Sequence, residues 1–408
     1  MSYCPHTKCR ICESTNLHPV FDLGVQPLAN NFVKPGESRQ GHYPLQVLFC
    51  TKCTLSQLSV VVDPAVLYRN YSYVTSTSET MAKHFEHLIE LLNSEEEIYS
   101  LVEIGSNDGA FLKLIQSQIE CHTVGIDPAI NLALASTHLT ITDFFNKQTA
   151  RRAFDLIEGA PSVILARHCV AHMDDLHEFV DALTTLAGHE TLIAIEIPYM
   201  RDTLQRVEFD QSYHEHLNFI NLPALEILLS TTPFHIHRVV HYAVHGGTVL
   251  VLLRHHKSRI QPTVSEYVRE DKVTLEDWRL FSIKAHQKIS HMYDVVASRA
   301  MGGKTVCGFG ASAKASVWIN ACGFTEREIR YVTDNSPHKP GCLMPGTNIP
   351  VISQSRFMEV AQANYQIKAE YAVLFAWNFR DEVLSSQTEW RSRGGRFIIP
   401  TATGVEIV

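Results

Sequence analysis

The chain has 408 residues, of which 45% are hydrophobic, so it can furnish buried cores for two or three domains of ~150 residues each. Its formal charge is -8 at pH 7, from 35 basic and 43 acidic residues, so its composition does not indicate a positively charged surface that would bind nucleic acid. No stretch approaches the ~20 consecutive apolar residues of a membrane-spanning helix, so we expect no membrane partner. We therefore expect a cytoplasmic protein that acts on a small molecule.

Two Cys-x-x-Cys pairs lie near the N-terminus, Cys9 with Cys12 and Cys50 with Cys53. Each pair lets two thiolates reach one ion, and two pairs complete a tetrahedral zinc site. Because four thiolates leave no open position for water, we expect the zinc to be structural. The alternative is a set of buried or redox-active cysteines. We interpret residues 1–65, which are rich in turn formers, as a small zinc-binding domain.

Residues 66–256 alternate short apolar runs with helical patterns, which predicts a parallel sheet covered by helices on both faces. The runs expected to form its strands are 101–104, 123–126, 139–141, 163–166 and 192–197. Two further runs, 235–241 and 248–253, flank Gly246 and Gly247 and predict a closing antiparallel hairpin.

A sharp turn follows the first of these strands and leads into a helix expected to begin near Asp108. Gly105 and Gly109 permit the turn and a close approach of the backbone to a ligand. About twenty residues later the next strand ends at Asp127 and Pro128, where folds of this architecture bind ribose hydroxyls. The pair of features predicts a nucleotide-like cofactor.

Two classes of cofactor fit this geometry. A nicotinamide dinucleotide is disfavoured, because Asn107 occupies the middle glycine position of the Gly-x-Gly-x-x-Gly pattern. Glu103 at the strand end favours S-adenosylmethionine, whose ammonium must be neutralised, over a pyrophosphate. Phe144 and Phe145 follow the third strand and either border the adenine or pack in the core. The residues expected to hold S-adenosylmethionine are Glu103, Gly105, Ser106, Asn107, Gly109, Asp127, Pro128, Phe144 and His168.

A run of ionisable side chains, Tyr213, His214, Glu215 and His216, follows the fifth strand. Ligands bind beyond the carboxyl ends of strands in open α/β folds, and a histidine can accept a proton near neutral pH. Zinc binding by the two histidines is a rival interpretation. It is disfavoured because side chains at positions i and i+2 do not face each other on a helix and point apart on a strand.

A second group follows the fourth strand, where His168 and His172 would share one face if the segment were helical. The alternative is a capped helix with exposed imidazoles.

Tyr71 and Tyr73 lie in a polar stretch between the zinc segment and the sheet, which suits either a substrate lid or a linker.

Residues 257–408 are predicted to contain a long helix and a second Rossmann-like domain. Apolar residues recur at helical spacing from Leu275 onward, and Gly302 and Gly303 end the pattern. The strands expected beyond it are 304–308, 329–332, 371–375 and 396–399.

Together these parts resemble the zinc-containing C-methyltransferases that act on nucleotide-linked keto-sugars in deoxysugar pathways. The likeness covers nearly the whole chain. Besides the paired cysteines, it rests on residues 26–30, 71–73, 103–109, 213–216, 246–247 and 308–314. The resemblance implies an α/β fold with an N-terminal zinc-binding domain, a central class I methyltransferase sheet and a C-terminal Rossmann-like domain.

The family's reaction uses a base to remove the C-3 proton of a nucleotide-linked 4-keto-6-deoxy sugar, after which the enolate attacks the methyl group of S-adenosylmethionine. By resemblance, His216 is the base, and Glu215 and Tyr213 position it. His172 would lie near the keto oxygen or the reacting carbon. The resemblance thus implies catalytic roles for Tyr71, Tyr73, His172, Tyr213, Glu215 and His216, without a catalytic metal.

In the C-terminal domain the resemblance implies that Gly308, Gly310 and Lys314 hold the nucleotide diphosphate. Asp334, at the end of the next strand, would instead suit NAD. This chain departs from the family pattern at Arg167 and His168, which stand where the sugar enzymes carry asparagine. The departure bears on the identity of the substrate that accepts the methyl group. The alternative functions are O- or N-methylation of another small molecule and non-catalytic binding of a nucleotide sugar.

Overall fold

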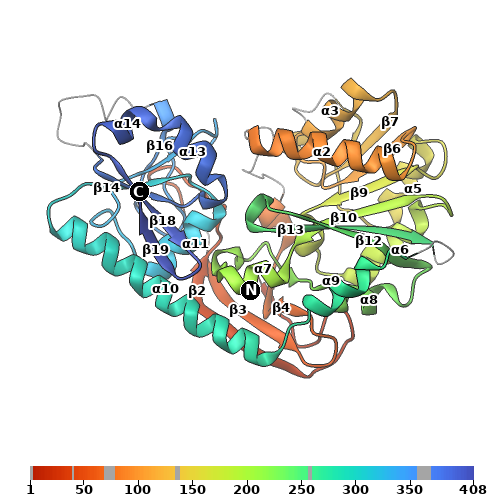
Figure 1. Cartoon of the computed structure of the whole chain (residues 1–408), viewed down its shortest axis with the longest axis horizontal. Helices are drawn as coiled ribbons and strands as arrows, with labels where there is room; N and C mark the ends of the chain where they lie inside the picture. The colour runs from red at the N-terminus through yellow and green to blue at the C-terminus, as the bar shows by residue number, and fades with distance from the viewer. Residues whose placement is uncertain (1–2, 39–40, 69–78, 134–137, 256–259, 356–368) are drawn as a thin grey trace. The chain divides into compact units, whose positions relative to one another are not determined.

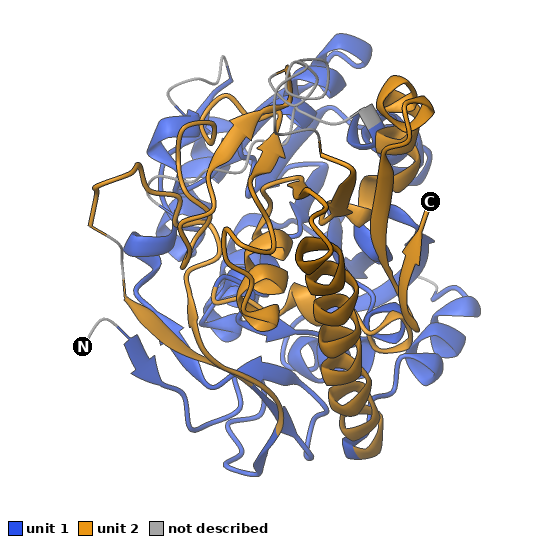
Figure 2. Cartoon of the chain, turned by 90° about the vertical axis from the view of Figure 1, so that its left-hand side faces the viewer, with its two compact units in different colours: residues 1–19, 47–203, 215–275 blue, residues 20–46, 204–214, 276–408 orange. Residues whose placement is uncertain are grey.

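The computed structural model describes residues 3–38, 41–68, 79–133, 138–255, 260–355 and 369–408 (Figure 1). The chain forms two compact units, each assembled from three separate segments (Figure 2). The first comprises Met1–Pro19, Val47–Thr203 and Glu215–Leu275. The second comprises Val20–Gln46, Leu204–His214 and Glu276–Val408.

The N-terminal region is built from short antiparallel strands. Its elements are β1 (Tyr3–Pro5), β2 (Leu17–Pro27), β3 (His42–Cys50), β4 (Ser56–Leu58), β5 (Val60–Val62) and helix α1 (Pro64–Tyr68). β1 pairs with β5, and a four-stranded sheet has the order β11-β4-β3-β2, with β11 at Asn218–Phe219. Buried Arg10 fixes the first cysteine turn, since its Nε donates to Asp174 at 2.9 Å and its Nη1 donates to the carbonyl of Leu58 at 3.2 Å.

The first unit contains a seven-stranded sheet of order β12-β13-β10-β9-β6-β7-β8. Its strands are β6 (Ser100–Ile104), β7 (His122–Ile126), β8 (Thr140–Ile141), β9 (Val163–Arg167), β10 (Leu192–Pro198), β12 (Phe234–Tyr242) and β13 (Thr248–His255). The first five run parallel, and β13 and β12 close the sheet as an antiparallel pair. The predicted strands and hairpin are confirmed. Their near-continuous apolar sequences follow from burial on both faces.

Helices cover both faces of this sheet, with α2 and α3 on one side and α6, α8 and α9 on the other (Figure 1). The helices of this region are α2 (Glu79–Glu95), α3 (Ala110–Gln118), α4 (Ile130–Ala133), α5 (Lys147–Leu156), α6 (Leu176–Leu186), α7 (Met200–Arg206), α8 (Leu222–Leu229) and α9 (Thr263–Glu270). Three short 3-10 helices are η2 (Val170–His172), η3 (Phe209–Gln211) and η4 (Val244–Gly246).

The second unit contains a six-stranded sheet of order β16-β15-β14-β17-β18-β19, in which only β19 is antiparallel to its neighbour. Its strands are β14 (Val306–Phe309), β15 (Val332–Asp334), β16 (Val351–Ser353), β17 (Tyr371–Leu374), β18 (Arg396–Thr401) and β19 (Gly404–Ile407). The helices are α10 (Leu275–Met301), α11 (Ala313–Cys322), α13 (Arg380–Ser386), α14 (Thr388–Ser392) and the 3-10 helix η5 (Trp377–Phe379). The predicted Rossmann-like domain is confirmed, although the sequence pattern missed the short strands β16 and β19.

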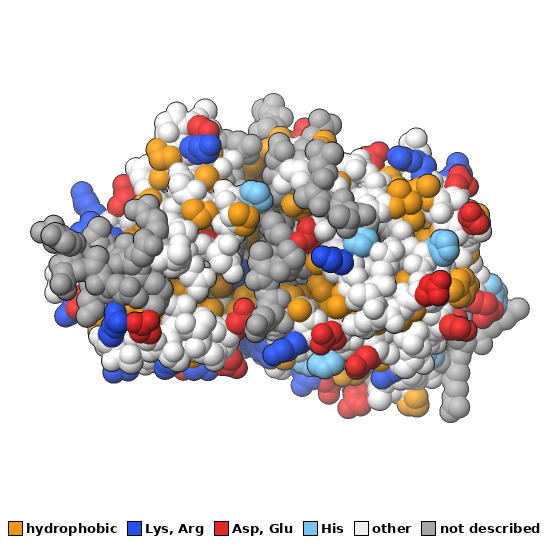
Figure 3. Space-filling model, turned by 90° about the horizontal axis from the view of Figure 1, so that it is seen from above, with side chains coloured by type: hydrophobic (Ala, Val, Ile, Leu, Met, Phe, Trp, Pro, Cys, Tyr) orange, Lys and Arg blue, Asp and Glu red, His pale blue; other side chains and the backbone are white. Residues whose placement is uncertain are grey.

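Acidic and basic side chains are intermixed over the face shown in Figure 3. Among the described residues, no helix has both the length and the apolar character needed to cross a membrane.

Candidate functional site

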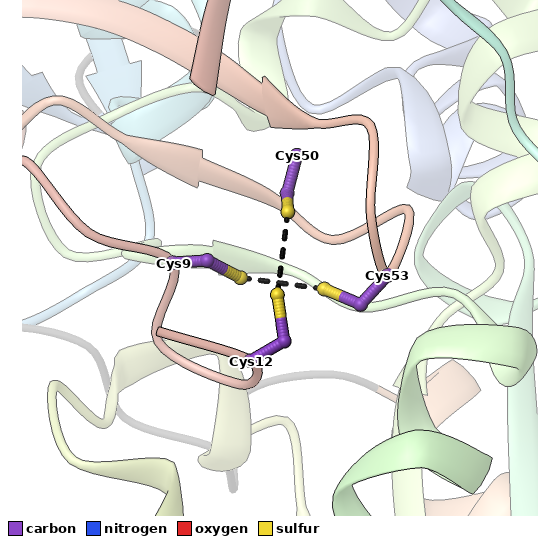
Figure 4. A group of neighbouring side chains, drawn as sticks. All are labelled: Cys9, Cys12, Cys50 and Cys53. Atoms are coloured by element: carbon purple, nitrogen blue, oxygen red, sulfur yellow. Dashed lines mark hydrogen bonds between the residues drawn. The ribbon is translucent and has the colours of Figure 1, made fainter. Parts of the chain in front are cut away.

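The four paired cysteines converge on one point in the N-terminal region (Figure 4). Their sulfur atoms all lie within 4.8 Å of one another, with Cys9 Sγ 3.3 Å from Cys53 Sγ and Cys12 Sγ 3.5 Å from Cys50 Sγ. The hydrogen bond from Cys53 lowers the pKa of the Cys9 thiol, whereas burial raises that of Cys50, as expected for thiols held together in one buried cluster. Among the described residues this is the one group of His, Cys, Asp or Glu with such geometry, and its four sulfur donors fit a structural zinc.

The glycine loop after β6 has the backbone conformation that its sequence predicts. Gly105 and Gly109 have φ values of 74° and 75°, in the left-handed region that glycine tolerates best. A Cβ at Gly105 would lie 2.8 Å from the Cβ of Cys169, so a side chain there has no room. Gly109 is the N-cap of α3, which begins at Ala110, two residues beyond the expected Asp108.

Glu103 is fully buried at the end of β6 and is paired with Arg167 at the end of β9. Both Nη2 and Nε of Arg167 donate to Glu103 Oε1, at 2.5 and 3.1 Å, and the guanidinium lies 4.2 Å from the ring centre of Phe85. Burial raises the pKa of Glu103 to about 7, and the charge of Arg167 opposes that rise. Because Arg167 compensates much of the charge of Glu103, Glu103 repels a pyrophosphate less than its position in the sequence alone suggests.

Two buried polar atoms in this region, Glu103 Oε2 and Ser106 Oγ, have no hydrogen-bond partner among the residues that the structure describes. Nearby, Asp127 accepts the backbone N–H of Asn107 at Oδ2 and that of Ala129 at Oδ1, both at 2.8 Å. The carboxylate at the end of β7 thus holds the glycine loop in place. Unsatisfied polar atoms beside a glycine loop fit a polar ligand such as S-adenosylmethionine, which would supply their missing partners.

The two phenylalanines after β8 differ in their surroundings. Phe145 packs edge-on against Phe179 in the core, whereas Phe144 is 38% exposed and its ring centre lies 6.3 Å from that of Tyr68. Core packing therefore explains Phe145 alone. Phe144 remains the candidate neighbour of an adenine.

A cluster of three aromatic side chains joins α1, η2 and the run before β11. The hydroxyl of Tyr68 lies 3.1 Å from His172 Nδ1 and donates to the backbone carbonyl of Glu215 at 3.1 Å. The rings of His172 and His216 meet edge to face with their centres 5.0 Å apart. Burial lowers the pKa of His172 to about 4, so its imidazole is neutral at physiological pH.

Tyr68 is a site residue that the sequence analysis missed. The predicted tyrosines, Tyr71 and Tyr73, lie outside the described residues. Tyr68 ends the short helix α1 and is buried, so its hydroxyl reaches His172 from a fixed element. A sequence signal was available, since the same tyrosine-rich stretch begins there.

The helical interpretation of residues 168–172 is wrong at its start. His168 has a φ of 50°, and only Val170–His172 form a turn of 3-10 helix. The backbone N–H of His168 instead donates to the carbonyl of Glu196 on β10 at 2.8 Å, and its Nε2 lies 3.5 Å from the carboxylate of Glu196. His168 and His172 consequently do not share a helical face.

Neighbouring residues of the 213–216 run have different surroundings. Buried His214 directs its Nε2 at the backbone carbonyls of Tyr43 and Pro44, at 3.3 and 3.2 Å, and its pKa is lowered to about 4 by burial. Glu215 is buried, while Tyr213 and His216 are partly exposed. This arrangement gives His214 a structural role.

In the second unit, packing explains both glycines of the loop after β14. A Cβ at Gly308 would lie 2.8 Å from the ring of Phe375, and one at Gly310 would lie 2.6 Å from the Cβ of Ala376. Lys314, in the first turn of α11, has its Nζ buried without a hydrogen-bond partner and 5.0 Å from the ring centre of Trp377. The carboxylate of Glu208 is an electrostatic neighbour of Lys314, but no described residue hydrogen-bonds the lysine Nζ, which leaves its donors for an acidic ligand.

Asp334 at the end of β15 is already neutralised within its own unit. Its Oδ2 lies 3.6 Å from the buried Nζ of Lys339, which donates to the carbonyl of Ala311 at 2.9 Å, and its Oδ1 accepts the backbone N–H of Ser336. These contacts tie β15 to the loop before α11. They leave Asp334 poorly suited to the ribose contact that NAD requires.

Known protein families and a known relative match most of the chain. Three family models match in succession, the "Putative zinc binding domain" at residues 9–68, the "Methyltransferase domain" at 76–239 and the "C-methyltransferase C-terminal domain" at 243–401. C-methyltransferase NovU from Streptomyces niveus is 30% identical over 409 residues, which span 97% of this chain and 96% of NovU.

Solved structures resemble part of the chain. The plantazolicin methyltransferase BpumL, in complex with a triazolic desmethylPZN analog and SAH, aligns with 44% of this chain and 86% of its own length, at 14% identity and a TM-score of 0.35. The N-methyltransferase NodS from Bradyrhizobium japonicum WM9 aligns with 44% of this chain and 98% of its own length, at 12% identity and a TM-score of 0.34.

Proposed function

The chain belongs to the C-methyltransferases that carry an N-terminal zinc-binding domain and depend on S-adenosylmethionine, and from this premise we propose that its acceptor is a nucleotide-linked 4-keto-6-deoxy sugar. The observation that carries the proposal is the cluster of Tyr68, His172 and His216 beyond the carboxyl ends of the parallel strands. Carbon methylation needs a base, and this cluster supplies one beside polar groups that orient a carbonyl.

In the proposed mechanism His216 removes the proton from C-3, which the neighbouring 4-keto group acidifies. The electron pair moves into the enolate, whose oxygen accepts a hydrogen bond from a tyrosine hydroxyl beside the neutral imidazole of His172. Tyr71 and Tyr73 are candidates for that tyrosine, while Tyr68 holds His172. S-adenosylmethionine supplies the electrophilic methyl group, to which C-3 bonds as the bond from sulfur breaks.

The positions of the remaining residues support these proposed roles. Glu215 and Tyr213 are proposed to orient His216 and tune its charge, since both precede it in the same run. Glu103 Oε2 and Ser106 Oγ are proposed to contact S-adenosylmethionine, because both are buried polar atoms without a partner. Holding donor and acceptor in line is a large part of the rate enhancement expected for such a reaction.

The proposed assignment of the domains gives residues 1–65 to zinc, 66–256 to S-adenosylmethionine and methyl transfer, and 257–408 to the nucleotide of the substrate. Lys314 is the proposed contact to the diphosphate, supported by its buried, unpartnered Nζ. A cytoplasmic location is proposed because no disulfide joins any of the ten cysteines, and four of them form the zinc cluster.

Incubation with S-adenosylmethionine and a panel of nucleotide-linked 4-keto-6-deoxyhexoses tests the function. The expected product carries one added methyl group that survives mild acid. In deuterium oxide with S-adenosylhomocysteine in place of the donor, the C-3 proton should exchange with solvent. His216→Ala should abolish exchange and turnover while calorimetry shows unchanged binding of S-adenosylmethionine.

The alternatives give different results. Methylation of another small molecule at oxygen or nitrogen predicts no added mass on any sugar of the panel. A non-catalytic binding protein predicts binding of a nucleotide sugar without heat on addition of S-adenosylmethionine. Retained exchange in His216→Ala would remove His216 from the role of base.

A further inference from the structure

Two tryptophans of the second unit share one carboxylate oxygen. Asp210 is buried on η3, and its Oδ2 accepts the indole N–H of Trp318 at 3.0 Å and that of Trp377 at 2.7 Å. Trp318 is buried on α11, whereas Trp377 begins η5 and is partly exposed. All three residues belong to the second compact unit. The same buried side chain therefore fixes both indole rings.

A lysine ammonium lies beside each of these rings. Lys288 Nζ is 5.6 Å from the ring centre of Trp318, and Lys314 Nζ is 5.0 Å from that of Trp377. Lys314 and Trp318 are four residues apart on α11, and Lys288 comes from α10. An ammonium within about 6 Å of an indole ring is attracted by the negative face of that ring. The five side chains form one set of contacts centred on Asp210, which we call the Asp210 network.

The two lysines differ in what their N–H groups contact. Lys288 is buried, and its Nζ donates to the backbone carbonyls of Arg206 at 3.3 Å and Val207 at 3.1 Å. The Nζ of Lys314 is buried too, but no described residue accepts a hydrogen bond from it. The ring of Trp377 attracts the charge of Lys314 without the lone pair of a carbonyl or carboxylate oxygen. Lys288 thus has a structural role, whereas the donors of Lys314 are left for a ligand.

Glu208 is an electrostatic neighbour of Lys314 but does not hydrogen-bond its ammonium. Its side chain is buried, and its Oε2 accepts the amide of Gln211 at 3.4 Å. Burial raises the pKa of Glu208 to about 7, and the charge of Lys314 opposes that rise. Trp377 is therefore the side chain that the structure places in direct contact with the ammonium of Lys314.

We propose that Asp210 and Trp377 are positioning residues for Lys314. The carboxylate fixes the indole ring, and the ring holds the ammonium while its donors bind the diphosphate of a nucleotide. A lysine side chain has many rotamers, so a fixed aromatic partner reduces the entropy that is lost when an anion binds. The inference rests on the proposed function for the identity of the anion, but the dependence of Lys314 on its two partners is measurable by itself.

Calorimetry of the full-length protein with thymidine diphosphate, uridine diphosphate and inorganic pyrophosphate tests the proposal. Trp377→Leu removes the aromatic face and should raise the dissociation constant of the tightest probe about fivefold. Trp377→Phe keeps a ring but loses the bond to Asp210, so we expect a rise of about threefold. Asp210→Leu should resemble Trp377→Phe. Asp210→Asn keeps an oxygen that both indoles can share, so its dissociation constant should stay within about twofold of the wild type.

Lys314→Met shows whether the two positioning residues act through the lysine. In the Lys314→Met background, Trp377→Phe should have no further effect on the dissociation constant, because the ammonium that the ring holds is absent. An equal effect of Trp377→Phe in both backgrounds would overturn the proposal, since a general loss of packing weakens both proteins alike. If Asp210→Leu does not fold, Trp377→Phe and this comparison carry the test.

Trp390→Phe is the matched control. Trp390 is buried in the same unit, and its indole N–H donates to the backbone carbonyl of Ala369 at 2.9 Å. The variant loses the same kind of hydrogen bond outside the Asp210 network, so it should bind the probes as the wild type does. A loss of affinity as large as that of Trp377→Phe would contradict the proposal. Binding of S-adenosylhomocysteine should be unchanged in every variant that folds.

The binding measurements separate this proposal from the proposed function. A wild-type protein that binds none of the three probes overturns the role of Lys314 and its partners, and so does unchanged affinity in Trp377→Leu. If no nucleotide-linked sugar is methylated but the variants lose affinity for the probes as expected, the proposed function fails and the positioning of Lys314 is supported.

Discussion

Tyr68, His172 and His216 illustrate how single contacts decide the role of a residue. Three side chains from separate segments meet within hydrogen-bond or ring contact, whereas His214, adjacent to the same loop, is committed to backbone carbonyls. Both His172 and His214 have a pKa lowered to about 4 by burial. Of these residues, His216 is therefore the one proposed to exchange a proton during turnover.

Tyr68→Phe tests whether the phenol hydroxyl orients His172. The variant loses the bonds to His172 Nδ1 and to the carbonyl of Glu215, at a cost of about 1–3 kcal/mol for buried groups left unsatisfied. We expect kcat to fall about tenfold or more, with little change in the dissociation constant of S-adenosylmethionine. Steady-state kinetics and calorimetry provide the two measurements. Unchanged kcat would show that His172 is held by other contacts.

His214→Gln tests the acid sensitivity of the fold. In the folded chain the pKa of His214 is about 4, whereas in the unfolded chain it returns to about 6.5. The unfolded state thus binds more protons between these pH values, so stability is fully present above pH 6.5 and is lost as the pH falls toward 4. Wild type should lose at most about 3 kcal/mol relative to the variant across this window, in urea unfolding. A pH-independent difference would contradict the buried, neutral state of His214.

At the scale of elements, short segments without regular secondary structure carry most of the chemistry. The two cysteine turns bring their four thiols together, and the buried Cys9, Cys50 and Cys53 also belong to the hydrophobic core of the first unit. Metal binding and packing are therefore coupled there, because loss of the ion leaves thiols facing one another in a buried site. Similarly, the glycine loop before α3 is held by the carboxylate of Asp127 from the next strand.

Cys50→Ser tests the zinc site, with Cys4→Ser as its control. Cys50 is buried in the cluster, whereas Cys4 is exposed and outside it. We expect about one zinc ion per chain in the wild type and in Cys4→Ser, measured by atomic absorption, and a large loss in Cys50→Ser. Limited proteolysis should then cut the variant within residues 9–53. A full complement of zinc in Cys50→Ser would remove that cysteine from the ligand set.

At the scale of the whole molecule, the chain contains two sheets of related strand order. In each, a central strand, β6 or β14, is followed by a glycine loop and a helix, and the strand order reverses beside it. Ligands bind at such switch points in open α/β folds. The first sheet has an acidic strand end with Glu103, and the second has Lys314 in the first turn of α11. The two sheets thus place different side chains at their switch points, the Glu103–Arg167 pair in the first and Lys314 in the second.

Lys314→Met tests the ligand of the second sheet. The variant keeps an unbranched chain but removes the buried cation beside Trp377, so the dissociation constant of nucleoside diphosphates should rise at least about tenfold, while that of S-adenosylhomocysteine is unchanged. Lys304→Met is the control, because Lys304 is half exposed and paired with Glu370. Calorimetry with a panel of nucleoside diphosphates measures the dissociation constants of both variants. An equal loss of affinity in Lys314→Met and Lys304→Met would indicate a general effect of charge.

The sequence by itself determined the fold class, the positions of the main strands along the chain, the paired cysteines and the glycine loop, because each depends on local spacing and composition. The tertiary structure decided the pairing of Glu103 with Arg167, the contact of Glu196 with His84 and the contact of Tyr68 with His172, since these residues are far apart in sequence. A glutamate within an apolar strand was the visible signal for Glu196, but its partners come from α2 and from the loop after β9. Long-range contacts fix charge state and orientation, which spacing along the chain cannot encode.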